Sequence, residues 1–192
     1  MRTHTSTGVL VCFLGMTLIA RDAEALAGTF DHPPETVSLI DSTDLPRTIT
    51  VGPDLQDIVA HMMRESEIFR RQCGLIGRLR WLRVHIVLEE PPNGVRRVRA
   101  KSDLARYEFG LITARVRVWS REDAIELIAH ELEHVIEVAE GTDYQSLLVR
   151  RLVVWSVDGT SFETARAIHT GLEVKREVWL ANARLGDARS LR

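Results

Sequence analysis

Cysteine, proline, aromatic residues and an excess of either charge are all scarce in this sequence. Its 192 residues include 2 cysteines, 6 prolines and 6% aromatic side chains, and 25 Lys and Arg stand against 27 Asp and Glu. This composition excludes a disulfide scaffold, a collagen-like fibre and a disordered tail. A net charge of −2 argues against a nucleic-acid binder, which is normally basic. The length and the 45% hydrophobic content predict one domain with a continuous core.

A hydrophobic run long enough to span a bilayer is also missing. A span needs about 20 apolar residues, and the apolar runs of this sequence are shorter. The apolar run Gly8 to Ala20 follows Arg2 and is itself followed by Ala25-Leu26-Ala27, a small-x-small site. This pattern predicts a signal peptide, residues 1–27, cleaved after Ala27, with an uncleaved amphipathic anchor as the alternative. We therefore expect a secreted or periplasmic protein with no stable membrane span.

Cys12 lies inside the predicted signal peptide, so Cys73 would be the only cysteine of the mature chain. No intramolecular disulfide is then possible. We expect Cys73 to be buried in a helix, with a reactive thiol or an intermolecular bridge as the alternatives.

Residues 28–52 are rich in proline and show little periodicity, so they predict an irregular lead-in. Apolar residues recur at helical spacing over residues 53–73, with Pro53 suited to the first turn and Gly74 and Gly77 to the exit. This segment predicts a scaffold helix at the start of a single domain, residues 53–192.

Two segments alternate between apolar and polar residues, as half-buried strands do. They span residues 81–90 and 111–120. The residues Pro-Pro-Asn-Gly at 91–94 predict a turn after the first strand, and a basic loop follows it.

A helix is predicted from Ser120, a good N-cap, to about Ala139, with Gly141 ending it. One face is an apolar stripe, and the opposite face is polar. The polar face carries Asp123, Glu126, His130, Glu133, His134 and Glu137.

The rest of the chain gives a weaker pattern. Residues 143–157 fit either a helix or a short strand. Asp158-Gly159 marks a turn, and Thr160 would cap a helix from Ser161 toward Leu185, with Gly171 as a possible break. Helices and strands in this order predict an α+β fold.

The chemically informative motif is His130-Glu131-Leu132-Glu133-His134, which matches H-E-x-x-H on a predicted helix. Two histidines four residues apart lie one turn apart on one face, where both can bind a single zinc ion. Glu131 projects beside the metal and could take a proton from a water that the metal acidifies. The motif predicts zinc-dependent peptide hydrolysis. The alternative is a solvated helix face with Glu-His pairs, such as Glu126 with His130, that binds nothing.

These residues resemble the zincin metallopeptidases, and more narrowly the gluzincins, whose third metal ligand is a Glu on a downstream helix. The resemblance covers roughly residues 81–180 and extends to small exported bacterial proteins of HExxH type. It implies that Glu163, 29 positions after His134, is the third ligand. It also implies that strand 111–119 is an edge strand that pairs with an extended peptide substrate.

Other roles for these residues stay open. Glu163 could instead close a capping box with Thr160, and Glu137 and His169 are rival third ligands. Many gluzincins carry an Asp four residues after the ligand Glu, where this chain has Ala167. Support for the metal-bound histidine must then come from elsewhere.

A transition-state oxyanion could be stabilised by His169 or, more weakly, by Tyr144 or Arg166. Residues 122–143 hold 8 acidic side chains and no Lys or Arg, which would favour a divalent cation and cationic substrates. The basic residues of 64–121 could contact acidic envelope surfaces, although a solvated face explains them as well.

Two function classes follow from these observations. The first is a secreted or periplasmic zinc peptidase with His130, His134 and Glu163 as ligands and Glu131 as general base. The second is a non-catalytic zincin-like module that binds a metal or a partner. The small size of the chain and the lack of the Asp that would orient a metal-bound histidine favour the second class.

Overall fold

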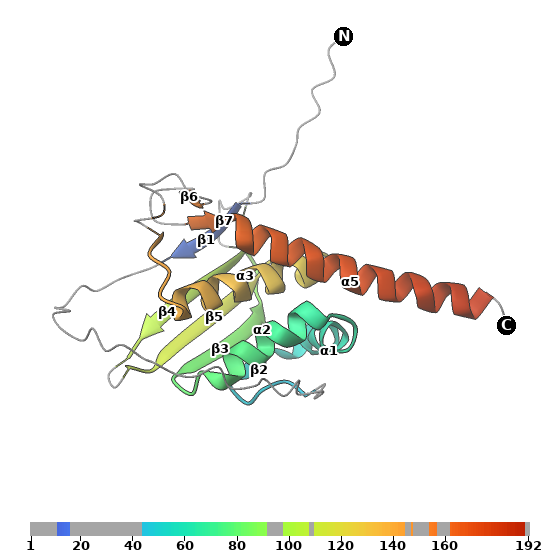
Figure 1. Ribbon diagram of the computed structural model, residues 1–192, viewed down its shortest axis with the longest axis horizontal. Coiled ribbons are helices and arrows are strands. Elements are labelled where there is room, and N and C mark those ends of the chain that lie inside the picture. The colour runs from blue at the N-terminus through green and yellow to red at the C-terminus, as the bar shows by residue number, and fades with distance from the viewer. Residues whose placement is uncertain are drawn as a thin grey trace, which may run out of the picture.

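The computed structural model describes residues 44–91, 98–107, 110–144 and 162–190, together with Leu147 and two short strands, β1 (Val11–Gly15) and β6 (Val154–Ser156). The described part is an α+β fold with four α-helices and a mixed β-sheet, the class that the sequence predicts. Helices α1, α2 and α3 lie on one face of the sheet, and the long helix α5 packs along α3 (Figure 1). Within the described residues, no helix is both long and apolar enough to cross a membrane.

The large sheet has the strand order β1-β4-β5-β3-β2. Strand β5 is parallel to β3 and antiparallel to β4, while β2 is parallel to β3 and β1 to β4. The two predicted strands are confirmed as β3 and β5. The bounds of the four strands beside β1 are Ile49–Val51 (β2), Leu82–Leu88 (β3), Val98–Arg106 (β4) and Ile112–Val118 (β5).

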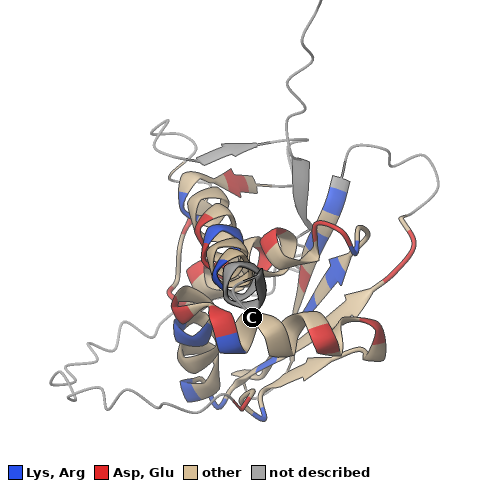
Figure 2. Cartoon of the chain, turned by 90° about the vertical axis from the view of Figure 1, so that its right-hand side faces the viewer, with Lys and Arg blue, Asp and Glu red and all other residues tan. Residues whose placement is uncertain are grey.

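The two faces of this sheet differ in chemistry. Alternate side chains of β3 and β5 are buried against the helices, as the alternation predicts. Several of the intervening positions carry charged residues, which lie on the sheet face that no described helix covers. Figure 2 shows Lys and Arg in blue along these strands. These outward residues include Arg83, Lys101, Arg115 and Arg117, several of them paired with Glu89 or Asp103.

Two predictions about the strands are wrong. The segment before residue 111 is not only a loop, because residues 98–106 form β4. Its inward positions include Ala100 and Ser102, which are buried but small or polar, so no apolar alternation shows in the sequence. Strand β5 is not an edge strand, because β3 and β4 pair with it on both sides. The outer side of β4 pairs with β1.

Strand β1 lies inside the predicted signal peptide. Cleavage after Ala27 stays a prediction, because residues 16–43 lie outside the described residues. The predicted irregular lead-in contains an unforeseen strand, since Ile49–Val51 form β2.

The predicted helix over residues 53–73 is two helices joined at Ser66. Pro53 opens a short 3₁₀ turn, Pro53–Leu55, before α1 (Gln56–Glu65) and α2 (Glu67–Arg78). Ser66 is buried with an extended backbone, and its Oγ accepts a hydrogen bond of 3.1 Å from the Phe69 N–H, which caps α2. The helical spacing continues through this break, so periodicity alone does not show it.

The expected exit at Gly74 and Gly77 is also wrong, since both lie inside α2. A Cβ on Gly77 would lie 2.9 Å from the Pro46 side chain, so the glycine allows the lead-in to pack closely on this helix.

Helix α3 spans Ala124–Ala139 and begins four residues later than predicted. Ser120 and Asp123 form reciprocal hydrogen bonds of 3.3 and 3.0 Å in the turn before it, and Asp123 is the N-cap residue. Gly141 ends the helix with a φ of 82°, which glycine adopts without steric cost.

The predicted helix from Ser161 with Thr160 as its cap is wrong at its start. Phe162–Thr164 form strand β7, which pairs with β6, and α5 (Ala165–Ser190) begins directly afterwards. Thr164 Oγ1 accepts a hydrogen bond of 3.0 Å from the Ala167 N–H, so Thr164 is the residue that caps α5.

Gly171 does not break α5. A Cβ at this position would lie 2.9 Å from the Glu126 carbonyl oxygen and 3.1 Å from His130 Cβ. Gly171 therefore lets α5 approach α3 closely. The predicted turn at residues 158–159 lies outside the described residues, as does most of the ambiguous segment 143–157, of which 154–156 form β6.

The apolar core lies between the helices and the sheet. Cys73 is buried in α2, as predicted, and burial raises the pKa of its thiol to about 12. A reactive thiolate at this position is therefore disfavoured. Other fully buried core side chains are Leu55, Met62, Phe69, Ile76, Leu82, Ile86, Leu127, Ile128 and Leu132.

Candidate metal centre

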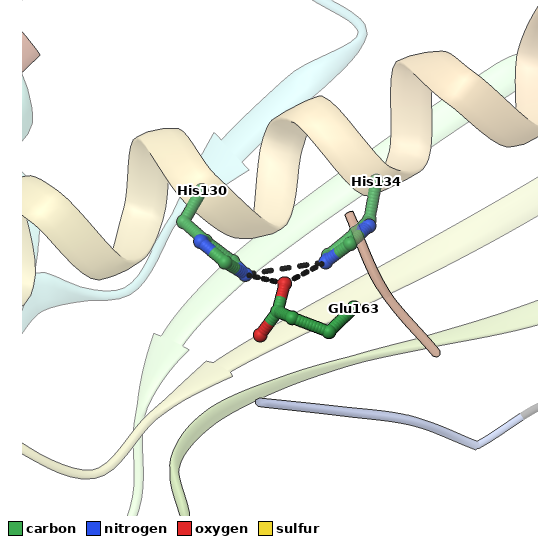
Figure 3. A group of neighbouring side chains, drawn as sticks. All are labelled: His130, His134 and Glu163. Atoms are coloured by element: carbon green, nitrogen blue, oxygen red, sulfur yellow. Dashed lines mark hydrogen bonds and ion pairs between the residues drawn. The ribbon is translucent and has the colours of Figure 1, made fainter. Parts of the chain in front are cut away.

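Three side chains from two elements converge beneath α3. His130 and His134 lie one turn apart on α3, and Glu163 lies on β7, immediately before α5 (Figure 3). One ligand atom of each residue lies within 4.8 Å of the others, so the group could hold a metal ion. The structure thus brings together the three residues that the sequence singles out, although Glu163 stands on a strand and not on a helix.

The spacing of these atoms suits a tetrahedral metal ion. The Nε2 atoms of His130 and His134 are 3.2 Å apart, and they lie 3.0 and 3.3 Å from Glu163 Oε1. Ligands at the zinc bond length of about 2.0–2.1 Å in a tetrahedron are about 3.3 Å from one another. Three corners of such a tetrahedron are therefore in place.

Burial and charge together set the protonation of the group. Burial by itself lowers the pKa of His134, but hydrogen bonds to Glu137 and Glu163 and the charge of Glu131 outweigh it and raise that pKa to about 10. Burial raises the pKa of Glu163, but the two histidines outweigh it and lower that pKa to about 2. In the metal-free chain, a proton on His134 thus faces an ionised Glu163.

Glu131 is fully buried, and neither of its carboxylate oxygens has a hydrogen-bond partner among the described residues. A buried carboxylate without a partner is costly unless a cation or a ligand compensates it. Glu131, Glu137 and Glu163 together place three carboxylates around two histidines. This surplus of acceptors favours a divalent cation at the centre.

Glu137 is near the site but is not placed as a third ligand. Its Oε2 lies 3.1 Å from His134 Nδ1, the ring nitrogen that faces away from Glu163. The Thr164 and Tyr144 hydroxyls donate hydrogen bonds of 3.0–3.1 Å to the same carboxylate. The sequence offers one signal for this contact, the three-residue spacing from His134 on one helix face.

The other candidates named from the sequence make different contacts in the structure. His169 is exposed on α5. Tyr144 is buried, with its hydroxyl on Glu137 and the His134 carbonyl oxygen, and Arg166 is paired with Glu133 and Glu140. The described geometry therefore does not place any of them as an oxyanion donor. The proposed capping partner of Glu163, Thr160, lies outside the described residues.

The acidic face of α3 is not a solvated surface. Glu126, Glu133 and Glu137 are all at most 8% exposed. Glu126 pairs with Lys175 at 2.6 Å, and Glu133 pairs with Arg166 at 2.5 Å and accepts from Gln72 at 2.7 Å. Lys175 and Arg166 of α5 compensate the charges of Glu126 and Glu133, so these two carboxylates offer little uncompensated charge to a cationic substrate.

Comparisons with family models, curated proteins and solved structures find no significant match to this chain. The function is therefore inferred from the chemistry of the site itself.

Proposed function

We propose that the protein is a zinc-dependent peptidase of zincin-like, gluzincin-like type. The observation that carries this proposal is the convergence of His130, His134 and Glu163, with atoms 3.0–3.3 Å apart, beside the unpartnered carboxylate of Glu131. Two histidines and one carboxylate leave the fourth tetrahedral position open, which is the ligand set of catalytic zinc sites. We also propose that the α+β fold is zincin-like.

The roles of the side chains follow from their positions. Bound zinc supplies Lewis acidity, which acidifies a water and polarises a peptide carbonyl. Glu131 takes the proton of the attacking water and then donates it to the departing amine. His130, His134 and Glu163 hold the centre. Because all four side chains are at most 1% exposed, the low-dielectric surroundings strengthen each of these electrostatic interactions.

The substrate class and the location extend the same proposal. A peptide or protein substrate follows from the H-E-x-x-H chemistry, and export follows from the N-terminal leader pattern. Unpaired backbone groups of an extended peptide could pair with a strand edge near the site. Removal of residues 1–27 would free the outer edge of β4, which β1 occupies.

A non-catalytic metal site is the second candidate, and the burial of the site favours it. His130, His134, Glu163 and Glu131 are enclosed, whereas a substrate must reach the metal of a catalytic centre. A closed site whose fourth ligand is not exchangeable would hold the fold together and would hydrolyse nothing.

Replacement of Glu131 by Gln separates the two candidates. For a peptidase we expect about one zinc per chain in the parent and in Glu131→Gln, and hydrolysis of a peptide library that falls about 10²–10⁴-fold in the variant. Glu133→Gln is the matched control, because Glu133 is a buried carboxylate on the same helix whose hydrogen bond and ion pair go to Gln72 and Arg166. Zinc should be measured by elemental analysis and cleavage by mass spectrometry.

An active Glu131→Gln protein would contradict the assigned mechanism. Stoichiometric zinc with no cleavage by the parent would favour the structural metal site. A parent that binds no zinc after reconstitution would contradict both candidates.

A further inference from the structure

We propose that Glu137 is the positioning residue for the metal ligand His134. The inference rests on the metal site proposed above and assigns a role to a carboxylate that belongs to neither the three ligands nor the general base. It answers a question that the resemblance to gluzincins raises, since the expected orienting Asp is replaced by Ala167, which is buried and apolar.

The first support is the side of the imidazole ring that Glu137 contacts. Glu137 Oε2 lies 3.1 Å from His134 Nδ1, while His134 Nε2 faces His130 and Glu163. A proton held on Nδ1 leaves the lone pair on Nε2, the nitrogen that points at the metal position. A metal-bound histidine normally donates its other N–H to a carboxylate or carbonyl in this way, which fixes the ring and raises its basicity.

The second support is that Glu137 is itself held in place. The Thr164 hydroxyl lies 3.0 and 3.1 Å from its two oxygens, and the Tyr144 hydroxyl donates to Oε2 at 3.1 Å. The Tyr144 ring stacks on Phe162 with centroids 5.4 Å apart. Because Phe162 and Thr164 flank Glu163 on β7, the strand that supplies the third ligand also positions the carboxylate that orients the second.

The two histidines differ in the contacts that their Nδ1 atoms make. His130 Nδ1 is buried and has no hydrogen-bond partner among the described residues. His130 Cβ instead packs against α5, since a Cβ on Gly171 would lie 3.1 Å from it. Of these two Nδ1 atoms, only that of His134 faces a carboxylate among the described residues, so loss of Glu137 should act on the metal through His134 alone.

The zinc affinity of Glu137→Gln tests this role. The amide keeps the shape and one acceptor but loses the charge, and we expect zinc to bind about 10–100-fold more weakly than in the parent. Affinity should be measured by competition with a chromogenic chelator on the full chain. Glu133→Gln is the control, and it should stay within about twofold of the parent, because Glu133 shares no partner with His134.

Tyr144→Phe is a milder variant that keeps the ring stacking and removes one donor to Glu137. We expect its zinc affinity to lie between those of the parent and Glu137→Gln. Thermal unfolding of each metal-free chain shows whether a variant is folded. Nitrogen-15 NMR of the zinc-loaded parent should show a proton on Nδ1 of His134, with a changed chemical shift in Glu137→Gln.

The outcomes separate this inference from the proposed function. Equal zinc affinity in Glu137→Gln and Glu133→Gln, with a zinc-binding parent, overturns the positioning role and leaves the metal site standing. A zinc-loaded parent without a proton on His134 Nδ1 does the same. A parent that binds no zinc overturns the proposed function and the positioning role together.

Discussion

Helix α3 is buried on two sides that differ completely in chemistry. Toward the sheet it presents Ile128, Leu132 and Val135, all at 0% exposure within the apolar core. Toward α5 and β7 it presents His130, His134, Glu126, Glu133 and Glu137, also nearly fully buried. We refer to these as the apolar side and the polar side of α3.

The difference shows which side needs a partner. Apolar burial is favourable at about 25 cal/mol per Å² without any specific geometry, so the apolar side stabilises the fold directly. A buried carboxylate or imidazole costs free energy unless another group compensates it. Lys175 and Arg166 compensate Glu126 and Glu133, whereas Glu131 and one oxygen of Glu163 have no partner among the described residues. A cation at the proposed metal site would compensate these oxygens.

Removal of the metal should have the largest effect on the polar side. If zinc is present at about 1,000 times its dissociation constant, it should stabilise the folded chain by about 4 kcal/mol. We expect a chelator, or His134→Ala, to abolish this stabilisation. Differential scanning calorimetry with and without zinc measures it, and a chelator-insensitive transition would contradict a bound metal.

The same site should respond to pH in a defined direction. Zinc must displace the proton of His134, whose pKa is about 10 without metal, so zinc affinity should rise as pH increases from 6 to 9. In the metal-free chain, this histidine's folded pKa exceeds its unfolded value of 6.5, and its stabilising contribution is complete below pH 6.5 and lost toward pH 10. Glu163, lowered from 4.5 to about 2, contributes fully above pH 4.5 and loses its contribution toward pH 2. The pair of His134 and Glu163 should therefore stabilise the folded metal-free chain most between pH 4.5 and 6.5. Calorimetry of that chain as a function of pH measures this contribution.

Leu132→Ala tests the apolar side within the H-E-x-x-H motif itself. Loss of a fully buried leucine should lower the free energy of unfolding by about 3 kcal/mol, because a cavity remains. Urea denaturation of the metal-free chain measures this change. Zinc affinity should stay close to that of the parent, and a large loss of affinity would show that the two sides of α3 are coupled.

Gly171→Ala should have a smaller effect on stability, and it acts where α5 meets the polar side. The added Cβ would lie 2.9 Å from the Glu126 carbonyl oxygen, so α5 must shift away from α3. We expect about 1–2 kcal/mol of destabilisation from this overpacking. Because the added Cβ would also lie 3.1 Å from the Cβ of the metal ligand His130, zinc affinity should fall as well. Gly74→Ala is the control, because its Cβ would meet only the end of the Arg78 side chain, 4.0 Å away.

The candidate site was predictable from the sequence where local geometry decides it. His130, Glu131 and His134 follow from a four-residue spacing on a helix, and the α3 helix itself follows from its periodicity and from Gly141. Glu163 was selected through the resemblance to gluzincins, and the structure places it beside both histidines, although on β7. Whether the three residues bind zinc stays a prediction.

The role of Glu137 could not be predicted from the sequence. The three-residue spacing between His134 and Glu137 fits a metal ligand as well as a positioning residue. Which role applies depends on the ring nitrogen of His134 that Glu137 faces. Two residues from outside α3, Tyr144 and Thr164, hold it there. Strand β4 was missed for a related reason, since Ala100 and Ser102 are buried by their neighbours and not by their own hydrophobicity.

By itself, the sequence determined the α+β class, strands β3 and β5 and most of helix α3. It also determined that the two histidines of α3 lie one turn apart on the same face. These features depend on periodicity and on interactions between residues close in the chain. Tertiary structure decided the closing of α5 and β7 over the polar side, the pairing of Glu126, Glu133 and Glu137, and the approach of α5 at Gly171. Those features depend on contacts between residues far apart in the chain, such as Glu137 and Thr164, 27 positions apart, and Glu126 and Lys175, 49 positions apart. Only the folded chain brings such residues close enough to replace water around buried charge.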